Sequence, residues 1–413
     1  MQFLRRVWRQ TSQCQALEHS SGRYETLFFE SIYRVTYVAG FAILDDSTPY
    51  LIYSSFIKTM IVLLLICETW HLLSDTTNLD VLIDNITVTM INFTTLYRYI
   101  NMRQNKFIYK KLVSAMESPY FDISTESRKR IFNFWVQRNE RFLILLLVLA
   151  GCTLGIWCVY PLVDDIEYNL MVSARFPFEY QTPVRYPILY MSVYMAFSYS
   201  STFVLLNDLI MQAHLMHLLC QYNILCNCFE SIISDCLGEN ECEHSETILT
   251  KKFKEKYLKK LNNLVNQHKF ILDNSMDFKK SLSKPMLAQL TASGFLICFL
   301  GYQASVNADP SNAKFFMSLL YILYALFELF IFCKWCDEIK IQSENIANSV
   351  YCSGWEKGIT AMPGVRARLL LVAIRARRPV IFTAGSLFEL SLASYTTLVK
   401  TSYSAVTVLR RFQ

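Results

Sequence analysis

Hydrophobic residues occur along this chain in long blocks that are separated by polar segments. Six blocks are long enough for a membrane-spanning helix, which takes about 20 residues, and a seventh, more polar block closes the chain. They cover residues 51–72, 81–102, 142–163, 186–211, 285–306, 315–333 and the segment that Pro379 opens. The pattern predicts an all-α membrane protein with seven transmembrane helices.

The polar segments divide the chain into further parts. We expect the segment before the first block to form, at residues 31–50, a short amphipathic helix and a turn at the membrane surface. A basic stretch at residues 103–140 reads as irregular, whereas residues 251–272 have a helical period and are expected to extend the flanking helices into the cytoplasm. The predicted parts are an N-terminal segment at 1–50, helices one to four at 51–211, a helical extension at 212–284, helices five and six at 285–333, a second polar region at 334–377 and the last helix at 378–413.

Composition agrees with a single membrane domain. The length alone would suit two or three soluble domains, but 53% of the residues are hydrophobic and only 18% are charged. The net charge of +6 comes from basic residues in separate loops, with no single basic patch, so nucleic-acid binding is not expected.

The placement of lysine and arginine predicts the orientation in the membrane. Both are frequent in the N-terminal segment, at 103–140, at 251–260 and at 334–378, and nearly missing from the alternate loops. Because cytoplasmic loops carry the basic excess, we expect a cytoplasmic N-terminus and an extracellular C-terminus. This is opposite to a G-protein-coupled receptor, whose DRY-like and NPxxY motifs are also missing here.

The last predicted helix has two unlike faces at 3.6 residues per turn. The apolar arc consists of Leu398, Val399, Ala405, Val406 and Leu409, and the polar arc of Ser394, Thr396, Thr397, Lys400, Thr401, Ser404 and Thr407. Ionisable residues are costly in hydrocarbon. The helix is therefore either buried in a bundle or lines a water-filled path.

Motifs of catalysis or metal binding do not occur. The chain has no Gly-rich phosphate loop, HExxH, GxSxG or paired carboxylate motif. Its six histidines are scattered, and its 13 cysteines lack zinc spacing. We expect neither an enzyme, nor a metal site, nor a cofactor.

Aromatic residues gather in the predicted outer halves of three helices. They are Trp157 (with Thr153 one turn before it), Tyr190, Tyr194, Tyr321 and Tyr324. If these helices adjoin, the side chains enclose an apolar cavity with a few polar groups, which suits a small hydrophobic ligand. An interfacial aromatic belt explains the same residues, and periodicity leaves both readings open.

The closing segment, RRPVIFTAGSLFELSLASYTTLVKTSYSAVTVLRR, resembles the C-terminal signature of insect odorant receptors. It has the basic residue and proline, the TAG triplet, the phenylalanine and leucine stretch and the lysine-x-SYS ending. Asp208 in the fourth span and CDEIKIQSENIANSVYCSGW after the sixth extend the resemblance. The sister gustatory receptors end in a TY…QF pattern, where this chain has Ser402 and Tyr403.

The resemblance implies an odorant-gated, non-selective cation channel. Family members form heterotetramers with an olfactory co-receptor in the plasma membrane of sensory neuron dendrites, joined by a cytoplasmic anchor that corresponds to 212–281 and 337–376. This chain lacks the long acidic, Ser-rich insertion of the co-receptor, so it is expected to be a ligand-specific subunit that meets lipid, a small volatile odorant and permeating cations. Alternatives are a metabotropic seven-helix chemoreceptor, a gustatory receptor and, more remotely, a small-molecule transporter.

The resemblance also implies roles for particular residues. It adds Phe93 to the aromatic residues of the predicted ligand pocket. Its hydrophobic gate corresponds to Val406, and the expected pore residues are Val399, Ser402, Val406, Leu409 and Arg410. Because Val406 lies on the apolar arc, we place the polar arc against neighbouring helices; Arg410 departs from the hydrophobic residue expected there.

Overall fold

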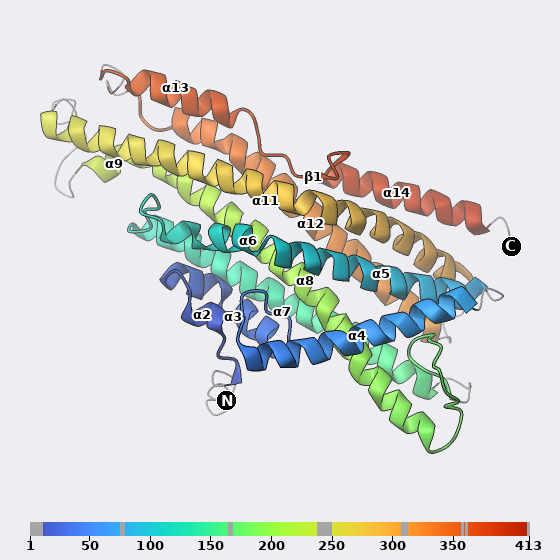
Figure 1. Cartoon of the computed structure of the whole chain (residues 1–413). Helices are drawn as coiled ribbons and strands as arrows, with labels where there is room; N and C mark the ends of the chain where they lie inside the picture. The colour runs from blue at the N-terminus through green and yellow to red at the C-terminus, as the bar shows by residue number, and fades with distance from the viewer. Residues whose placement is uncertain are drawn as a thin grey trace.

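The structure is a computed structural model that describes residues 11–74, 79–163, 168–237, 250–306, 313–356, 359 and 362–410. Long helices lie side by side and form one elongated bundle (Figure 1). The helices are α2 (Gln15–Glu18), α3 (Arg23–Val38), α4 (Thr48–Ser74), α5 (Leu79–Gln104), α6 (Lys106–Val113), the 3-10 helix η1 (Ser114–Glu117), α7 (Glu126–Val163), α8 (Arg185–Glu230), α9 (Ile232–Cys236), α11 (Lys251–Val306), α12 (Ala313–Tyr351), α13 (Val365–Ala376) and α14 (Leu392–Leu409). Strands β1 (Thr383–Ala384) and β2 (Phe388–Glu389) form a small antiparallel hairpin.

Helix α8 is the centre of the bundle. It packs against α4, α5, α7, α11 and α12, and nearly every residue from Phe203 to Phe229 is buried. A helix that is apolar on all sides needs protein around it. The sequence of α8 therefore places it inside, and the other long helices surround it.

Within the part of the chain that the structure describes, five helices are long and apolar enough to cross a membrane: α4, α7, α8, α11 and α12. Helix α5 is more polar, but Asn85, Asn92, Thr95 and Arg98 on it are all buried against other helices. The polar residues of α5 therefore face protein. The polar residues of α14 behave differently and are described with the candidate site.

The N-terminal segment corrects the expectation of a surface helix at 31–50. Helix α3 begins earlier, at Arg23, and its apolar side is buried, with Phe28 2% and Phe29 0% exposed. Both rings contact His217 of α8, at ring-centre distances of 5.0 and 5.3 Å. The helix is amphipathic as expected, but its apolar side meets protein.

Residues 103–140 are mostly helical, and the expectation of an irregular stretch was wrong. They hold α6, η1 and the beginning of α7. In α7, Arg128, Phe132, Trp135 and Asn139 follow one another at spacings of three or four residues and are all buried. This stripe is a helical signal that the frequent basic residues between its members conceal.

At one end of the bundle, α8, α11 and α12 continue far beyond the predicted spans and pack with α9 and α13 (Figure 1). The expected helical extension is present. Helix α8 runs unbroken to Glu230, and α11 begins at Lys251 and passes through Pro285 over 56 residues. We call this end the anchor region; it consists of the described residues of 212–284 and 334–377 together with residues 122–128, which ion pairs join to α9 and α11.

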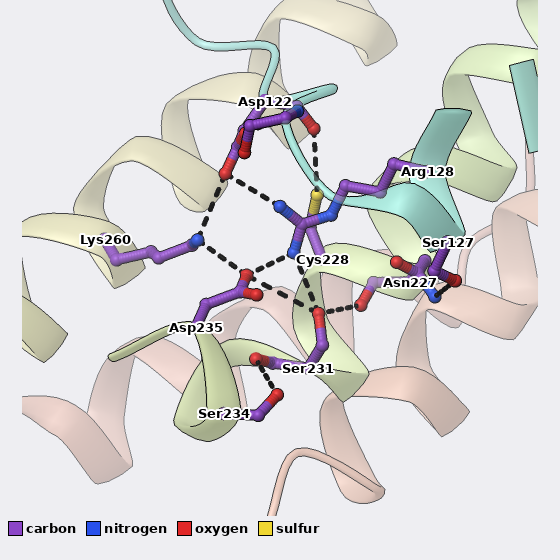
Figure 2. Close-up of polar contacts among 10 residues, drawn as sticks. Asp122, Ser127, Arg128, Asn227, Cys228, Ser231, Ser234, Asp235 and Lys260 are labelled. Atoms are coloured by element: carbon purple, nitrogen blue, oxygen red, sulfur yellow. Dashed lines mark hydrogen bonds and ion pairs between the residues drawn. The ribbon is translucent and has the colours of Figure 1, made fainter. Parts of the chain in front are cut away.

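A cluster of charges joins four segments of the anchor region (Figure 2). Arg128 of α7 pairs with Asp122 at 2.7 Å and with Asp235 of α9, and Lys260 of α11 pairs with the same carboxylates at 3.1 and 2.6 Å. Burial by itself would raise the pKa of Asp122, but hydrogen bonds from Ser124 and the Arg128 and Lys260 charges bring it down to about 2. Two cations thus balance two carboxylates.

The last helix begins at Leu392, and the prediction that Pro379 opens it was wrong. The TAG triplet forms strand β1 and the first residue of the β1–β2 turn, Gly385, which has φ +58° and donates its N–H to the Ser283 carbonyl of α11 at 2.8 Å. A Cβ on Gly385 would lie 2.4 Å from Leu287, so the turn needs glycine at this position. Ser391 then caps α14 by accepting from the Ser394 N–H at 3.2 Å.

Candidate ligand-binding site

A cavity of about 110 Å³ lies between α5, α7, α8, α11 and α12. Its lining consists of Val88, Ile91, Asn92, Thr94, Thr95, Ala150, Thr153, Leu154, Trp157, Phe197, Ser200, Ser201, Val204, Gln289, Ala292, Ser293, Leu296, Tyr321, Tyr324, Ala325 and Glu328. Aromatic and aliphatic groups alternate with hydroxyls and amides. Such a lining suits a small, mostly apolar molecule that carries one or two polar groups.

Aromatic rings form one wall of the cavity. Trp157 of α7 stacks on Phe197 of α8, with ring centres 5.3 Å apart, and meets the Tyr321 ring of α12 edge to face at 6.0 Å. These geometries are favourable for aromatic pairs. The wall is therefore held in place by contacts between three helices.

A buried network of charged and polar groups forms the base of the cavity. Arg98 of α5, 1% exposed, pairs with Asp208 at 2.5 Å and lies 3.5 Å from Glu328. Gln289 accepts from Arg98 at 2.8 Å and donates to Glu328 at 2.7 Å, and the Tyr324 hydroxyl donates to Asp208 at 3.4 Å. Because Gln289, Tyr324 and Glu328 also line the cavity, the network presents hydrogen-bonding atoms to its contents.

A second set of hydrogen bonds fixes the wall on the α5 side. Asn92 donates to Glu68 of α4 at 3.1 Å and accepts from Ser200 of α8 at 2.7 Å. The bonds orient the amide in an apolar surrounding, where an unpaired polar group is costly. Asn92 thus ties three helices together beside the cavity.

Four of the predicted pocket residues come together in this cavity: Thr153, Trp157, Tyr321 and Tyr324. Tyr190 and Tyr194 pack beside Trp157 in a neighbouring apolar cluster, and the Tyr190 hydroxyl donates to the Cys158 carbonyl at 2.8 Å. Phe93 is 50% exposed and does not line this cavity. Its neighbour Asn92 lines the cavity instead, because one residue along a helix turns the side chain by about 100°.

The comparisons with known proteins agree with this arrangement. A sequence profile described as 7tm Odorant receptor matches residues 78–403, which is most of the chain. The chain belongs to the insect odorant receptor family. Its members are ligand-gated cation channels that work with a co-receptor in tetramers.

Individual relatives are distant but cover most of the receptor. It is 23% identical to Odorant receptor 13a of Drosophila melanogaster, over 88% of each chain. It is 21% identical to Odorant receptor 10 of Aedes albopictus, over 78% of the receptor and 82% of that protein.

A solved structure supports the fold of the receptor. The insect olfactory receptor OR5 from Machilis hrabei, in a complex with eugenol, matches with a TM-score of 0.79 and 17% identity, over 95% of the receptor and 100% of that chain. Structures of this family have seven transmembrane helices. The receptor's seven are therefore α4, α5, α7, α8, α11, α12 and α14, of which α5 and α14 are more polar than the other five.

Helix α14 of the receptor lies on the outside of the bundle and packs against α11 and α12 (Figure 1). Ser402 is 5% exposed and donates to the Gly294 carbonyl at 3.1 Å. A Cβ added at Gly301 would lie 3.0 Å from Val406, so glycine lets α14 approach α11 closely. Two of the expected pore residues thus face the receptor's own α11.

The polar arc of α14 is exposed, contrary to its predicted place against neighbouring helices. Thr396, Thr397, Lys400, Thr401, Ser404 and Thr407 all lie on this open face, together with Tyr403. Val399 is half-buried at the edge of the face, Arg410 is exposed, and the Leu409 side chain lies outside the described residues. The single chain therefore leaves the polar side of α14 available for water or other subunits.

Sequence reasoning missed the network at the base of the cavity. Arg98, Asp208 and Glu328 each lie within a predicted span, and an ionisable residue in a span is a functional candidate by itself. Because one cation and two carboxylates lie in three separate spans, the sequence alone could have suggested that they form ion pairs with one another. Gln289 and Asn92 gave no such signal, since uncharged amides occur in many spans.

Proposed function

We propose that this receptor is the ligand-specific subunit of an odorant-gated, non-selective cation channel and that it opens with the olfactory co-receptor in a tetramer. The observation that carries the proposal is the cavity, which combines an aromatic wall with a hydrogen-bonding base on helices that continue toward the pore helix. Membership of the odorant receptor family supports the channel function. The sequence lacks the long acidic, Ser-rich insertion of the co-receptor, which supports a ligand-specific subunit.

The cavity sets the size and chemistry of the odorant. A dry cavity of about 150 Å³ in another protein holds benzene, so 110 Å³ suits a molecule of similar or smaller size before any side chain moves. The ligand's apolar body lies against Trp157 and Tyr321, and its polar group reaches Tyr324, Gln289 or Glu328. Small alcohols and phenols have this combination.

The pore follows α14. Its exposed polar face supports a water-filled path. Val399 lies at the edge of this face and Val406 is partly buried against Gly301 of α11, and we assign the closed gate to these two valines, because a ring of valines closes a pore by dewetting. Ser402, Leu409 and Arg410 belong to the same helix and complete the expected pore lining. Odorant binding shifts the receptor to the open state by its differential affinity for that state.

The orientation follows from the basic loops. The N-terminus and the anchor region lie in the cytoplasm and the C-terminus outside, at the plasma membrane of the sensory dendrite. The lysines and arginines of 251–260 and 334–378 belong to the anchor region of the structure, which supports this assignment.

The first experiment measures whole-cell current from cells that express the receptor alone or with the co-receptor, under a panel of small volatiles. Intracellular GTP is replaced by a non-hydrolysable analogue. We expect a fast cation current that needs both chains and does not depend on the nucleotide. Slow, nucleotide-dependent responses would make the receptor metabotropic and overturn the proposal.

A matched pair of variants tests the cavity in the same cells. Trp157→Ala removes the central ring of the wall, so the odorant concentration for half-maximal current should rise at least about tenfold, since a buried aromatic ring contributes well over 1 kcal/mol. Phe93→Ala changes an aromatic ring outside the cavity and should leave this concentration within about twofold. Equal effects of the two variants would move the ligand site elsewhere.

A further inference from the structure

A second hollow, of about 430 Å³, lies between α4 and α5, and Phe203 of α8 lies at its base. We call it the lipid groove. Its lining consists of Lys58, Ile61, Val62, Leu65, Asn92, Leu96, Tyr99, Ile100, Arg103, Gln104 and Phe203. Figure 1 shows the end of α4 close to the beginning of α5, and the two helices farther apart toward the beginning of α4 and the end of α5.

The lipid groove opens to the outside of the bundle. Val62 and Ile100 on its rim are 39% and 45% exposed, and the adjoining face of α4 presents Leu63 and Ile66 at 58% and 54% exposure. In a membrane helix such large apolar residues face acyl chains. The groove is therefore reached from the lipid.

Two cations lie at the wide end of the lipid groove, and its lining has no carboxylate. The Lys58 ammonium lies 4.9 Å from the centre of the Tyr99 ring, and Arg103 is exposed near the end of α5. None of the ion pairs of the described residues includes either cation. Unpaired charges next to an apolar surface favour an anionic partner that also has an apolar part.

The length of the lipid groove fits one membrane leaflet. From Arg103 to Asn92 the helix rises about 16 Å at 1.5 Å per residue, and half of the hydrocarbon core of a bilayer is about 15 Å. A lipid whose phosphate binds Lys58 and Arg103 would lay its acyl chain along Ile61, Leu65 and Leu96.

We propose that the lipid groove binds one anionic phospholipid of the leaflet on the anchor side, with its phosphate on Lys58 and Arg103. The same Asn92 lines the lipid groove and the ligand cavity, so the bound acyl chain rests on the cavity wall. The site is separate from the odorant site and does not require channel activity.

The test uses the purified full-length receptor, delipidated in detergent and titrated with palmitoyl-oleoyl phosphatidylserine or phosphatidylcholine, and native mass spectrometry counts the lipids bound to each chain. We expect one phosphatidylserine to be held more tightly than phosphatidylcholine. Lys58→Gln with Arg103→Gln should weaken its binding about 30-fold, since each cation contributes about fivefold to binding an anionic lipid. Lys106→Gln, which removes a nearby cation that pairs with Asp46 outside the groove, should leave binding unchanged.

Two further arms separate a lipid from a bare anion. Leu96→Trp fills the apolar part of the groove and should reduce phosphatidylserine binding while both cations remain. Soluble glycerophosphoserine, which has the headgroup without acyl chains, should not compete at millimolar concentration. Equal binding of both lipids, full binding by the double variant, or competition by glycerophosphoserine would each overturn the proposal.

Discussion

An arginine lies between two carboxylates at two places in this receptor, and the two places differ in what surrounds them. Arg98 in the helix bundle contacts Asp208 and Glu328, and the three side chains are 1%, 1% and 9% exposed. Arg128 in the anchor region contacts Asp122 and Asp235, but Lys260 adds a second cation and Asp122 is 36% exposed. The anchor cluster is balanced and reached by water, whereas the bundle cluster is dry and carries a formal excess of one carboxylate.

The difference indicates that the same arrangement, an arginine between two carboxylates, has a different role at each place. A balanced set of charges holds segments together and has no remaining capacity for a ligand. The unbalanced set around Arg98 lies at the base of the candidate ligand cavity, where Glu328 reaches both the network and the cavity. A buried uncompensated charge is costly, so a ligand donor or a proton on Glu328 stabilises this set.

The largest effect is expected at Arg98. Arg98→Ala leaves Asp208 and Glu328 buried without their cation, which should cost about 3–5 kcal/mol of stability and remove most of the folded receptor from the cell surface. Surface labelling and the melting temperature of the detergent-solubilised receptor measure this. Adding Asp208→Ala should restore part of the loss. An Arg98→Ala receptor with unchanged surface labelling and melting temperature would refute the role of the Arg98–Asp208 pair.

A smaller loss is expected at Arg128. Arg128→Ala leaves Asp122 and Asp235 with Lys260 still in place, so we expect the free energy of unfolding to fall by about 2–3 kcal/mol. Lys129→Ala is the matched control, because Lys129 pairs with Glu126 on the surface and such pairs contribute about 0–1 kcal/mol. If Arg128→Ala destabilised the receptor more than Arg98→Ala, the contrast between the two clusters would be wrong.

Within the bundle cluster the two carboxylates should not be equivalent. Asp208→Asn removes the close partner of Arg98 at 2.5 Å and should destabilise by about 2–3 kcal/mol, whereas Glu328→Gln keeps an acceptor for Gln289 and should change stability by less than about 1 kcal/mol. The Glu328 variant should instead alter the relative response to odorants with different polar groups. Thermal melts and dose–response curves together distinguish the two roles.

The smallest effect is a pH dependence at Asp122. The pKa of this carboxyl is about 2 in the fold against about 3.9 in an unfolded chain, so its contribution is full above pH 4 and disappears as the pH falls toward 2. Because its side chain is 36% exposed, solvent screening limits the contribution to about 1 kcal/mol. Asp122→Asn should lower the melting temperature at pH 7, and the difference from the unchanged receptor should shrink as the pH falls from 4 toward 2.

The sequence predicted the most apolar membrane helices well, because hydropathy can be read from each segment by itself. The blocks around α4, α7, α8, α11 and α12 are recognisable because lipid selects apolar residues one by one. It failed at the β1–β2 hairpin, since Gly385 and Ser386 take positive φ values that a helical pattern does not reveal.

The candidate site could be predicted only in part, for a similar reason. Trp157, Thr153, Tyr321 and Tyr324 carry an aromatic signal in each helix by itself. The pairing of Arg98 with Asp208, 110 residues apart, depends on how α5 and α8 lie together. The exposure of Phe93 and the contact of Val406 with Gly301 also depend on how the helices pack, so the sequence alone does not predict them.

Helix α12 has a further consequence for the speed of the response. It carries Tyr321 and Glu328 at the cavity, and one continuous helix later Asp337 accepts from the Leu392 N–H at the start of α14, while Lys340 pairs with Glu389 of the hairpin at 2.7 Å. No loop interrupts this connection. A displacement at one end of such a helix reaches the other end as a rigid tilt, so a signal from the proposed odorant site to the proposed pore helix α14 does not require any segment to refold.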